Sequence, residues 1–336
     1  MARLRSEPED FRVDEIPLYA PSGEGGHTFV LVEKRLRTTE EVARDLARAG
    51  GIRAADIGYA GRKDRVAVTT QWFSVEGFEP EAALSLQLPG VRVIEAHRHP
   101  HKLRTGQLRG NRFEINAREV DPETLATAAA RFEVLKRDGM PNRFGPQRFG
   151  WDGGNLEQAR RLLRGERIGA DRRHARFLLS ALQAAAFNAV LQERPLPLAG
   201  IENGDVAVVH ASGGVFRVED AQREEPRAAA FEISATGPIF GTRVLRPSGA
   251  AAERERAVFA TLGVDPDTLR PPPGIRLRGA RRALRVRLEA AELFAEGDCL
   301  RLRFTLPAGS YASVALEELL GACPGSGDTL RSAALS

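Results

Sequence analysis

Cysteine is nearly absent from this chain, since only Cys299 and Cys323 occur among its 336 residues. Two cysteines provide neither a disulfide framework nor a CxxC metal pair, and we expect both to be buried apolar side chains. No apolar run approaches the roughly 18 residues that a membrane-spanning helix needs, and the first residues lack the apolar core of a secretory signal. These absences predict a cytoplasmic protein that does not enter a membrane.

Lysine is also scarce, because the 49 basic residues include only four lysines and the rest are arginines. The net charge is only +4, yet the isoelectric point is about 9.4. Arginine presents a planar fork that binds phosphate through two parallel hydrogen bonds. The arginines are concentrated in residues 97–112 and 270–287, which contain no acids, and in residues 137–176, where ten arginines stand against five acids. A single charged run is usually a solvated face, but three runs mixed with Phe and Gly predict nucleic-acid binding.

The common cofactor and metal motifs are missing. Residues 58–64 contain two glycines and a lysine, but Gly61 is followed by Arg62, and Asp64 stands where a P-loop needs Ser or Thr. No GxGxxG opens a βαβ unit, and no HExxH or nucleophile elbow occurs. His97, His99 and His101 alternate, but we find no carboxylate or cysteine close enough to complete a metal site. No metal and no cofactor are predicted.

Hydrophobic patterning predicts an α+β fold. Thr38 and Glu41 form a capping box for a helix that ends at Gly50 and Gly51, and a second helix begins at Asp121 and ends at Gly139. A further helix is expected around residues 177–190, and a last one at 311–320. Strands are expected at residues 11–13, 27–32, 67–75, 91–93, 113–115, 205–210, 284–288 and 300–304.

The length favours two domains, and strands at both ends with a helix-rich middle suggest a sheet domain interrupted by an insertion. A Gly- and Arg-rich stretch near residue 150 and Pro271-Pro272-Pro273 mark the junctions. We therefore expect a first catalytic part at residues 1–150, an inserted domain at 151–275, a second catalytic part at 276–322 and a loose tail at 323–336.

The most informative segment is residues 58–65, Gly-Tyr-Ala-Gly-Arg-Lys-Asp-Arg. Gly58 and Gly61 would let the backbone turn sharply and approach a ligand. Asp64 stands among Arg62, Lys63 and Arg65, which favour its ionised form. This is how a nucleophile or general base on a nucleic-acid-binding surface would be prepared, although taken alone a solvated surface ion pair is the simpler interpretation.

A second candidate segment is Gly110-Asn111-Arg112-Phe113. Here an aromatic ring could stack on a base and an amide could bond to the edge of the base. A core strand residue is the simpler interpretation of Phe113.

With these segments in order, the chain resembles the TruD-type tRNA pseudouridine synthases over nearly its whole length. The blocks that carry the resemblance lie at residues 9–15, 23–27, 34–39, 58–69, 102–104, 110–113, 141–150 and 306–312. The resemblance implies a pseudouridine synthase catalytic domain with a mixed or antiparallel sheet, interrupted by an inserted α/β TRUD domain. It also implies isomerisation of uridine 13 in tRNA without a cofactor.

The resemblance also implies site residues. Asp64 falls at the position of the family's catalytic aspartate, and four further residues match active-site positions that bind substrate: Lys63, Phe11, Asn111 and Phe113. Arg5 stands where a relative has Lys, so the charge is kept with a different shape. Arg143 replaces an aromatic residue of the PN-x-FG-x-QRFG block, and its role is open. The candidates for further RNA contacts are Arg62, Arg65, Lys102, Arg104 and Arg148.

Two other functional classes compete with the enzyme. A non-catalytic RNA-binding protein of the same fold would bind tRNA without turnover, and a structural partner of ribosomal RNA would stay bound to ribosomes. We expect the protein to be a monomer that binds tRNA and needs no protein partner. Asp64 could attack C1′ or remove the C2′ proton, and the sequence leaves both roles open.

Overall fold

The computed structural model describes residues 2–150, 153–269 and 271–321, which form two compact units. The first unit takes the chain up to Glu133, then Leu288–Ala312, and resumes at Leu316. The second contains Val134–Arg287 and Ser313–Ala315. Segments near the beginning and near the end of the described residues thus contribute to one unit. The domain boundaries at residues 150 and 275 stay predictions, and the expected tail at 323–336 lies outside the described residues.

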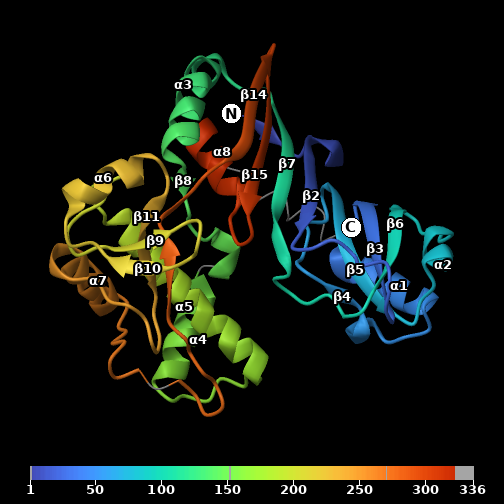
Figure 1. Ribbon diagram of the computed structural model, residues 1–336, viewed down its shortest axis with the longest axis horizontal. Helices are drawn as coiled ribbons and strands as arrows, with labels where there is room; N and C mark the ends of the chain where they lie inside the picture. The colour runs from blue at the N-terminus through green and yellow to red at the C-terminus, as the bar shows by residue number, and fades with distance from the viewer. Residues whose placement is uncertain (1, 151–152, 270, 322–336) are drawn as a thin grey trace. The chain divides into compact units, whose positions relative to one another are not determined.

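A mixed sheet forms the first unit, with its strands in the order β14-β15-β7-β2-β5-β3-β6 (Figure 1). β2 and β5 run parallel, and the other neighbouring pairs on this path are antiparallel. β1 pairs with β7, and β4 pairs with β5. The strands are β1 Arg3–Leu4, β2 Phe11–Pro17, β3 His27–Arg35, β4 Gly58–Tyr59, β5 Val68–Glu76, β6 Val91–His99, β7 Leu108–Arg118, β14 Glu289–Glu296 and β15 Cys299–Pro307. The predicted α+β class is confirmed.

Helix α1, Thr39–Ala49, starts with the predicted capping box. The Thr38 hydroxyl accepts the Glu41 N–H at 3.1 Å, and the Glu41 carboxylate accepts the Thr38 N–H at 2.7 Å. The hydrogen bond from the Thr38 N–H is the main cause that holds the pKa of Glu41 below its usual range. Leu46 is fully buried against Val30 and Phe73, so α1 covers one face of β3 and β5. The capping box therefore fixes the N-terminus of α1.

The remaining helices that contribute to the first unit are α2 Pro80–Leu84, α3 Pro122–Asp138, which continues into the second unit, and α8 Ala312–Leu320. The sequence patterning predicted α3 and α8, whereas the short α2 was not predicted. Gly139 follows α3 with φ +81°, a conformation that favours glycine, and so ends the helix as predicted.

Alternation along the strands puts four polar side chains on a buried face. Phe11 and Phe113 are almost fully buried, and every second residue of a strand shares their face. Glu15 lies on that face directly opposite Asn111, because β2 and β7 pair in that register. On β3 and β5, the fully buried Lys34 and Gln71 likewise lie at inward-facing positions that apolar residues occupy elsewhere on these strands. All four polar side chains contact the segment between β4 and β5 that carries Asp64.

The second unit contains a four-stranded sheet in the order β10-β9-β11-β12 and a two-stranded pair, β13 with β8. The long helix α5 buries Leu178 and Leu182 against Phe240, Ile275 and Leu277. The strands are β8 Met140–Pro141, β9 Val206–Val209, β10 Val215–Arg217, β11 Ile233–Ile239, β12 Ala280–Ala283 and β13 Arg285–Val286. The helices are α4 Gly154–Leu163, α5 Arg172–Gln192, α6 Ala221–Ala229 and α7 Gly249–Thr261.

Two strand assignments need correction. β14 was not predicted, because its Ala- and Glu-rich sequence is typical of a helix, yet it forms a hairpin with β15 through a turn at Gly297. The expected amphipathic strand at 284–288 shrinks to β13, and Arg285 is only 1% exposed. Its guanidinium donates to the Ser234 hydroxyl at 2.9 Å and lies 4.0 Å from the centre of the Phe231 ring. Arg285 is therefore part of the core and not of a nucleic-acid surface.

Candidate active site

Asp64 lies in the irregular segment between β4 and β5, and its side chain is 49% exposed. Arg5 donates a 2.6 Å hydrogen bond from Nη2 to Asp64 Oδ2. Among the described residues, no hydrogen-bond donor reaches the second oxygen, Oδ1. The carboxylate is thus anchored on one oxygen and open on the other.

The backbone of this segment is fixed at three points by buried side chains. Gln71 donates to the Gly61 carbonyl at 3.1 Å, and the Thr39 hydroxyl accepts the Lys63 N–H at 2.9 Å. Lys34 Nζ donates to the Asp64 carbonyl at 2.8 Å. Because Thr39 also donates to Gln71 at 2.7 Å, the first two anchors form one network. Buried side chains therefore fix the backbone of this irregular loop.

Lys63 points away from Asp64 into a buried polar cluster. Its Nζ donates to Asn111 Oδ1 at 2.6 Å and lies 3.1 Å from Glu15 Oε2. The Lys63 and Glu15 side chains are only 6% and 1% exposed. Glu15 Oε1 also accepts the Trp72 N–H at 3.2 Å. Lys63 therefore ties the segment that carries Asp64 to strands β2 and β7.

Arg5 also connects Asp64 to three aromatic side chains. Its guanidinium carbon lies 4.2 Å from the centre of the Phe11 ring. Phe11 meets Phe113 edge to face at 6.3 Å, and Phe113 stacks on Phe304 at 5.4 Å. Phe113 is only 7% exposed. All six residues predicted as catalytic or substrate-binding thus belong to one chain of contacts within the first unit, while their roles stay predictions.

The two glycines of the segment do not serve the purpose expected from the sequence. Neither Gly58 nor Gly61 has a positive φ, so no sharp turn requires them. A Cβ atom at Gly58 would lie 2.3 Å from the Leu103 carbonyl oxygen and from Ser74 Oγ, whereas one at Gly61 would meet nothing within 4 Å. The close approach at Gly58 is therefore to the protein itself and not to a ligand.

The predicted RNA-contact residues differ in how far their charges are already paired. Arg62 forms an exposed ion pair with Glu40 at 2.6 Å, and Arg65 donates to the Leu36 carbonyl at 3.3 Å. Lys102 donates to the Ala55 carbonyl at 3.1 Å. Arg104 is exposed and makes no ion pair with any residue in the described ranges.

Arg148 belongs to the second unit, where it donates to Ser180 at 2.9 Å and lies over Phe144 and Phe177.

The three alternating histidines have different surroundings. His97 lies 3.2 Å from Glu95, contrary to our expectation that no carboxylate is near. His99 is buried between Tyr19 and Phe29, and burial lowers its pKa. Within the ranges that the structure describes, no three His, Cys, Asp or Glu side chains are placed to hold a metal ion. None of the helices in these ranges has the length and apolar character needed to cross a membrane.

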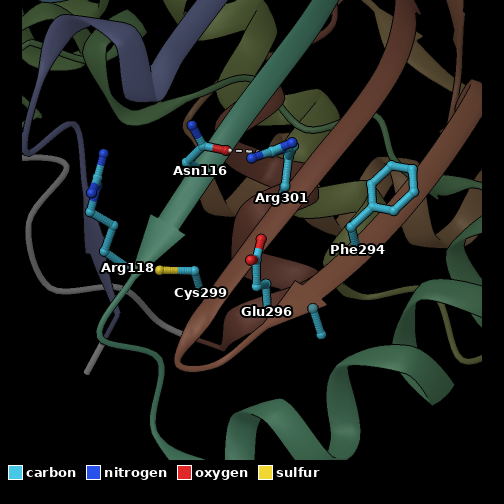
Figure 2. A pocket seen from close by; sticks show the side chains of 7 residues that line it. Asn116, Arg118, Phe294, Glu296, Cys299 and Arg301 are labelled. Carbon is cyan, nitrogen blue, oxygen red and sulfur yellow. Dashed lines mark hydrogen bonds between the residues drawn. The ribbon is translucent and has the colours of Figure 1, made fainter.

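A surface hollow lies at the other end of β7, over the β14–β15 hairpin (Figure 2). Arg301 donates to Asn116 at 3.3 Å across it, and Phe294 is 47% exposed. Asn116 lies on the face of β7 opposite to that of Asn111, so this hollow is not part of the Asp64 site. Cys299 lines it and is half-buried, so the expectation of a buried filler is wrong here, and Cys323 lies outside the described residues.

Sequence reasoning missed the residues that hold the Asp64 segment: Glu15, Lys34, Thr39 and Gln71. The alternation along the strands could have found two of them. Lys34 continues the inward-facing series of Val30 and Val32, and Glu15 continues that of Phe11 and Val13. A charged residue at the inward position of a strand needs a buried partner. Its partner becomes visible only from the tertiary fold.

Known proteins match this chain along nearly its whole length. The model of the family described as tRNA pseudouridine synthase D (TruD) matches residues 1–170 and 169–319. The tRNA pseudouridine synthase D of an Anaeromyxobacter species is 43% identical over 327 residues, covering 95% of this chain and 92% of that protein. The protein of the same name from Geobacter metallireducens is 39% identical over 380 residues, covering 94% of each chain.

The fold is also that of a solved structure. The crystal structure of the putative tRNA pseudouridine synthase D (TruD) from Methanosarcina mazei matches with a TM-score of 0.75 at 23% identity, covering 96% of this chain and 94% of that chain. At that identity the match shows the fold alone, and it agrees with the family model. The predicted resemblance is thus confirmed, and the chain belongs to the TruD family of tRNA pseudouridine synthases.

Proposed function

We propose that this chain isomerises uridine 13 of tRNA to pseudouridine without a cofactor, and that Asp64 is the catalytic carboxylate. Family membership and relatives named tRNA pseudouridine synthase D support the reaction and its substrate class. The structural observation that carries the assignment is the Asp64 carboxylate itself. It is 49% exposed, paired with Arg5 through one oxygen, and set on a backbone that three buried side chains fix.

The reaction exchanges one bond to C1′ for another. The N1–C1′ bond breaks, the uracil turns, and C5 bonds to C1′; C5 then loses its proton, and N1 gains one. The atoms and electrons balance without an oxidant or a reductant. The open oxygen of Asp64 can either attack C1′ or remove the C2′ proton. In both roles the hydrogen bond from Arg5 fixes the direction of the free oxygen of the carboxylate.

The uridine must leave its stack before Asp64 can reach the sugar, which costs a few kcal/mol. Asn111 is oriented for binding the extracted base: because Lys63 occupies Oδ1, the amide nitrogen remains to donate to a uracil carbonyl. Phe304 occupies one face of Phe113 and the ring is only 7% exposed, so stacking on a base requires neighbouring side chains to uncover the other face. Such stacking is worth roughly 1–3 kcal/mol, comparable to the cost of extraction.

The phosphate backbone then needs cationic contacts outside the site. We assign these to Arg62, Arg65, Lys102 and Arg104 in the first unit and to Arg148 in the second. Arg62 would exchange Glu40 for a phosphate, whereas Arg104 has no such ion pair with any described residue to break. Phe11 lies beneath the Arg5 guanidinium and holds it by a cation–π contact.

The test is release of tritium from tRNA that carries [5-³H]uridine, since forming the C5–C1′ bond expels that hydrogen. The wild type should release one label per tRNA, and mass-spectrometric mapping should place the pseudouridine at position 13. Asp64→Asn should abolish release and still bind tRNA. Asp56→Asn is the matched control, because Asp56 is a partly exposed carboxylate at the end of the preceding 3-10 helix (Ala54–Asp56) and is paired with Arg53.

The outcomes separate the candidate functions. Tritium release that persists in Asp64→Asn sinks the catalytic assignment, and a pseudouridine at another position sinks uridine 13. Tight tRNA binding by a wild type that releases no label would identify a non-catalytic RNA-binding protein. Stable co-sedimentation with ribosomes would indicate the structural role.

A further inference from the structure

Lys34 is a fully buried lysine without a carboxylate partner. It lies on β3 at 0% exposure, and no acid within the described residues forms an ion pair with it. Its Nζ donates to the Arg37 carbonyl at 2.6 Å and to the Asp64 carbonyl at 2.8 Å, and it lies 3.5 Å from the Lys63 carbonyl. One ammonium group thus joins the loop that follows β3 to the segment that carries Asp64.

The charges around Lys34 come from two elements. The segment that carries Asp64 contributes the Asp64 carboxylate and the Lys63 ammonium, and the first turn of α1 contributes Glu40 and Glu41. Across β5 the residue opposite Lys34 is the uncharged Thr69. Burial lowers the pKa of Lys34 to about 8, while Asp64 acts in the opposite direction and Lys63 adds to the lowering. Lys34 therefore changes its charge close to neutral pH.

We propose that Lys34 is a positioning residue for the reaction, which fixes the main-chain carbonyl of Asp64 and thereby the reach of its carboxylate. The inference rests on the proposed function of Asp64. Thr39 and Gln71 hold the neighbouring backbone atoms without a charge, so their hold does not change with pH. Lys34 is the anchor whose hydrogen bonds are charge-assisted, and such bonds are about twice as strong as neutral ones.

Deprotonation of Lys34 should therefore loosen Asp64 as the pH rises through about 8. The same titration does not unfold the protein. Between about 8 and the ordinary value of 10.5, the unfolded chain binds more protons at this residue than the folded chain. The contribution of Lys34 to stability accordingly increases with pH in this window. Activity and stability should thus move in opposite directions, which a purely structural lysine does not produce.

The experiment compares the wild type with Lys34→Met, which keeps the apolar stem and removes the ammonium. Single-turnover tritium release and tRNA affinity are measured from pH 6 to pH 10, with folding checked by thermal unfolding. Lys136→Met, an exposed lysine of α3, is the control. At pH 7 we expect the rate constant of Lys34→Met to be about 100-fold lower, the size of loss that a small misplacement of a catalytic group produces. The tRNA affinity should not change.

The ratio of the wild-type rate constant to that of Lys34→Met should shrink as the pH rises above about 8, because the wild type then loses the charge of Lys34. Ionisation of the RNA affects both rate constants and cancels in their ratio. A ratio that stays constant from pH 6 to pH 10 overturns the proposal, as does a full-rate Lys34→Met. If Lys34→Met does not fold, Lys34→Arg replaces it, and its rate constant should show no decline at that pH. An active Asp64→Asn shows instead that the proposed function has failed, whatever Lys34 does.

Discussion

Arg5 reaches Asp64 from a backbone conformation that arginine rarely adopts. Its φ is +59°, in the left-handed region, and its Nη2 lies 2.6 Å from Asp64 Oδ2. A residue other than glycine in this region costs about 1 kcal/mol or more. The strain persists because β1 pairs with β7 before Arg5 and the 3-10 helix Pro8–Asp10 follows it. The surrounding fold thus imposes the geometry that the ion pair uses.

Arg5→Ala should lower the rate constant for label release by on the order of 100-fold, because the carboxylate loses its only donor among the described residues. Arg5→Lys should retain part of the activity, since the charge remains but the planar fork is lost. Arg3→Ala is the control, as Arg3 forms an exposed ion pair with Glu119. An Arg5→Ala variant that loses only tRNA affinity would assign Arg5 to phosphate binding.

Glu15→Gln should destabilise the fold by about 3–5 kcal/mol, because it leaves the Lys63 ammonium buried without its carboxylate. The expected readout is the free energy of unfolding from chemical denaturation. Glu33→Gln should cost less than about 1 kcal/mol, since the Glu33 pairs with Arg12 and Arg92 lie near the surface. Adding Lys63→Met to Glu15→Gln should recover part of the loss. An additive double variant would show that the pair is not coupled.

The sequence predicted the elements of the first unit better than the contacts between them. Alternation gives β2, β7 and β15, and the Thr38 capping box gives α1, because both patterns are local. The contacts of Lys63 with Glu15 and Asn111 depend on the register of β2 against β7, which no local pattern specifies. β14 was missed for a related reason, since its pairing with β15 overrides the helical propensity of Ala and Glu.

Gly58→Ala should destabilise the protein by about 1–3 kcal/mol, because the added methyl group overlaps the Leu103 carbonyl and the Ser74 hydroxyl. This overlap should shift β4, displace the segment that carries Asp64 and so lower the rate constant for tritium release. Gly61→Ala provides the control within the same segment, as its added methyl group meets open space. Thermal unfolding and tritium release measure both effects. Equal melting temperatures for the two variants would contradict the close packing seen at Gly58.

The affinity for tRNA should fall steeply with salt concentration, because several arginines and lysines are expected to replace counterions on the phosphates. Arg104→Ala should weaken binding and make the slope of log K against log salt concentration less negative by about 1, since Arg104 is exposed and forms no ion pair with a described residue.

Arg53→Ala is the matched control for this measurement, because Arg53 is an exposed arginine outside the predicted RNA-contact residues and is paired with Asp56 at 2.8 Å. Its slope should equal that of the wild type. The measurement is filter binding of tRNA between low and physiological salt. A flat salt response of the wild type would show that the arginine-rich stretches are only solvated surface. Equal slopes for Arg104→Ala and the wild type would remove Arg104 from the RNA interface and leave the other candidates in place.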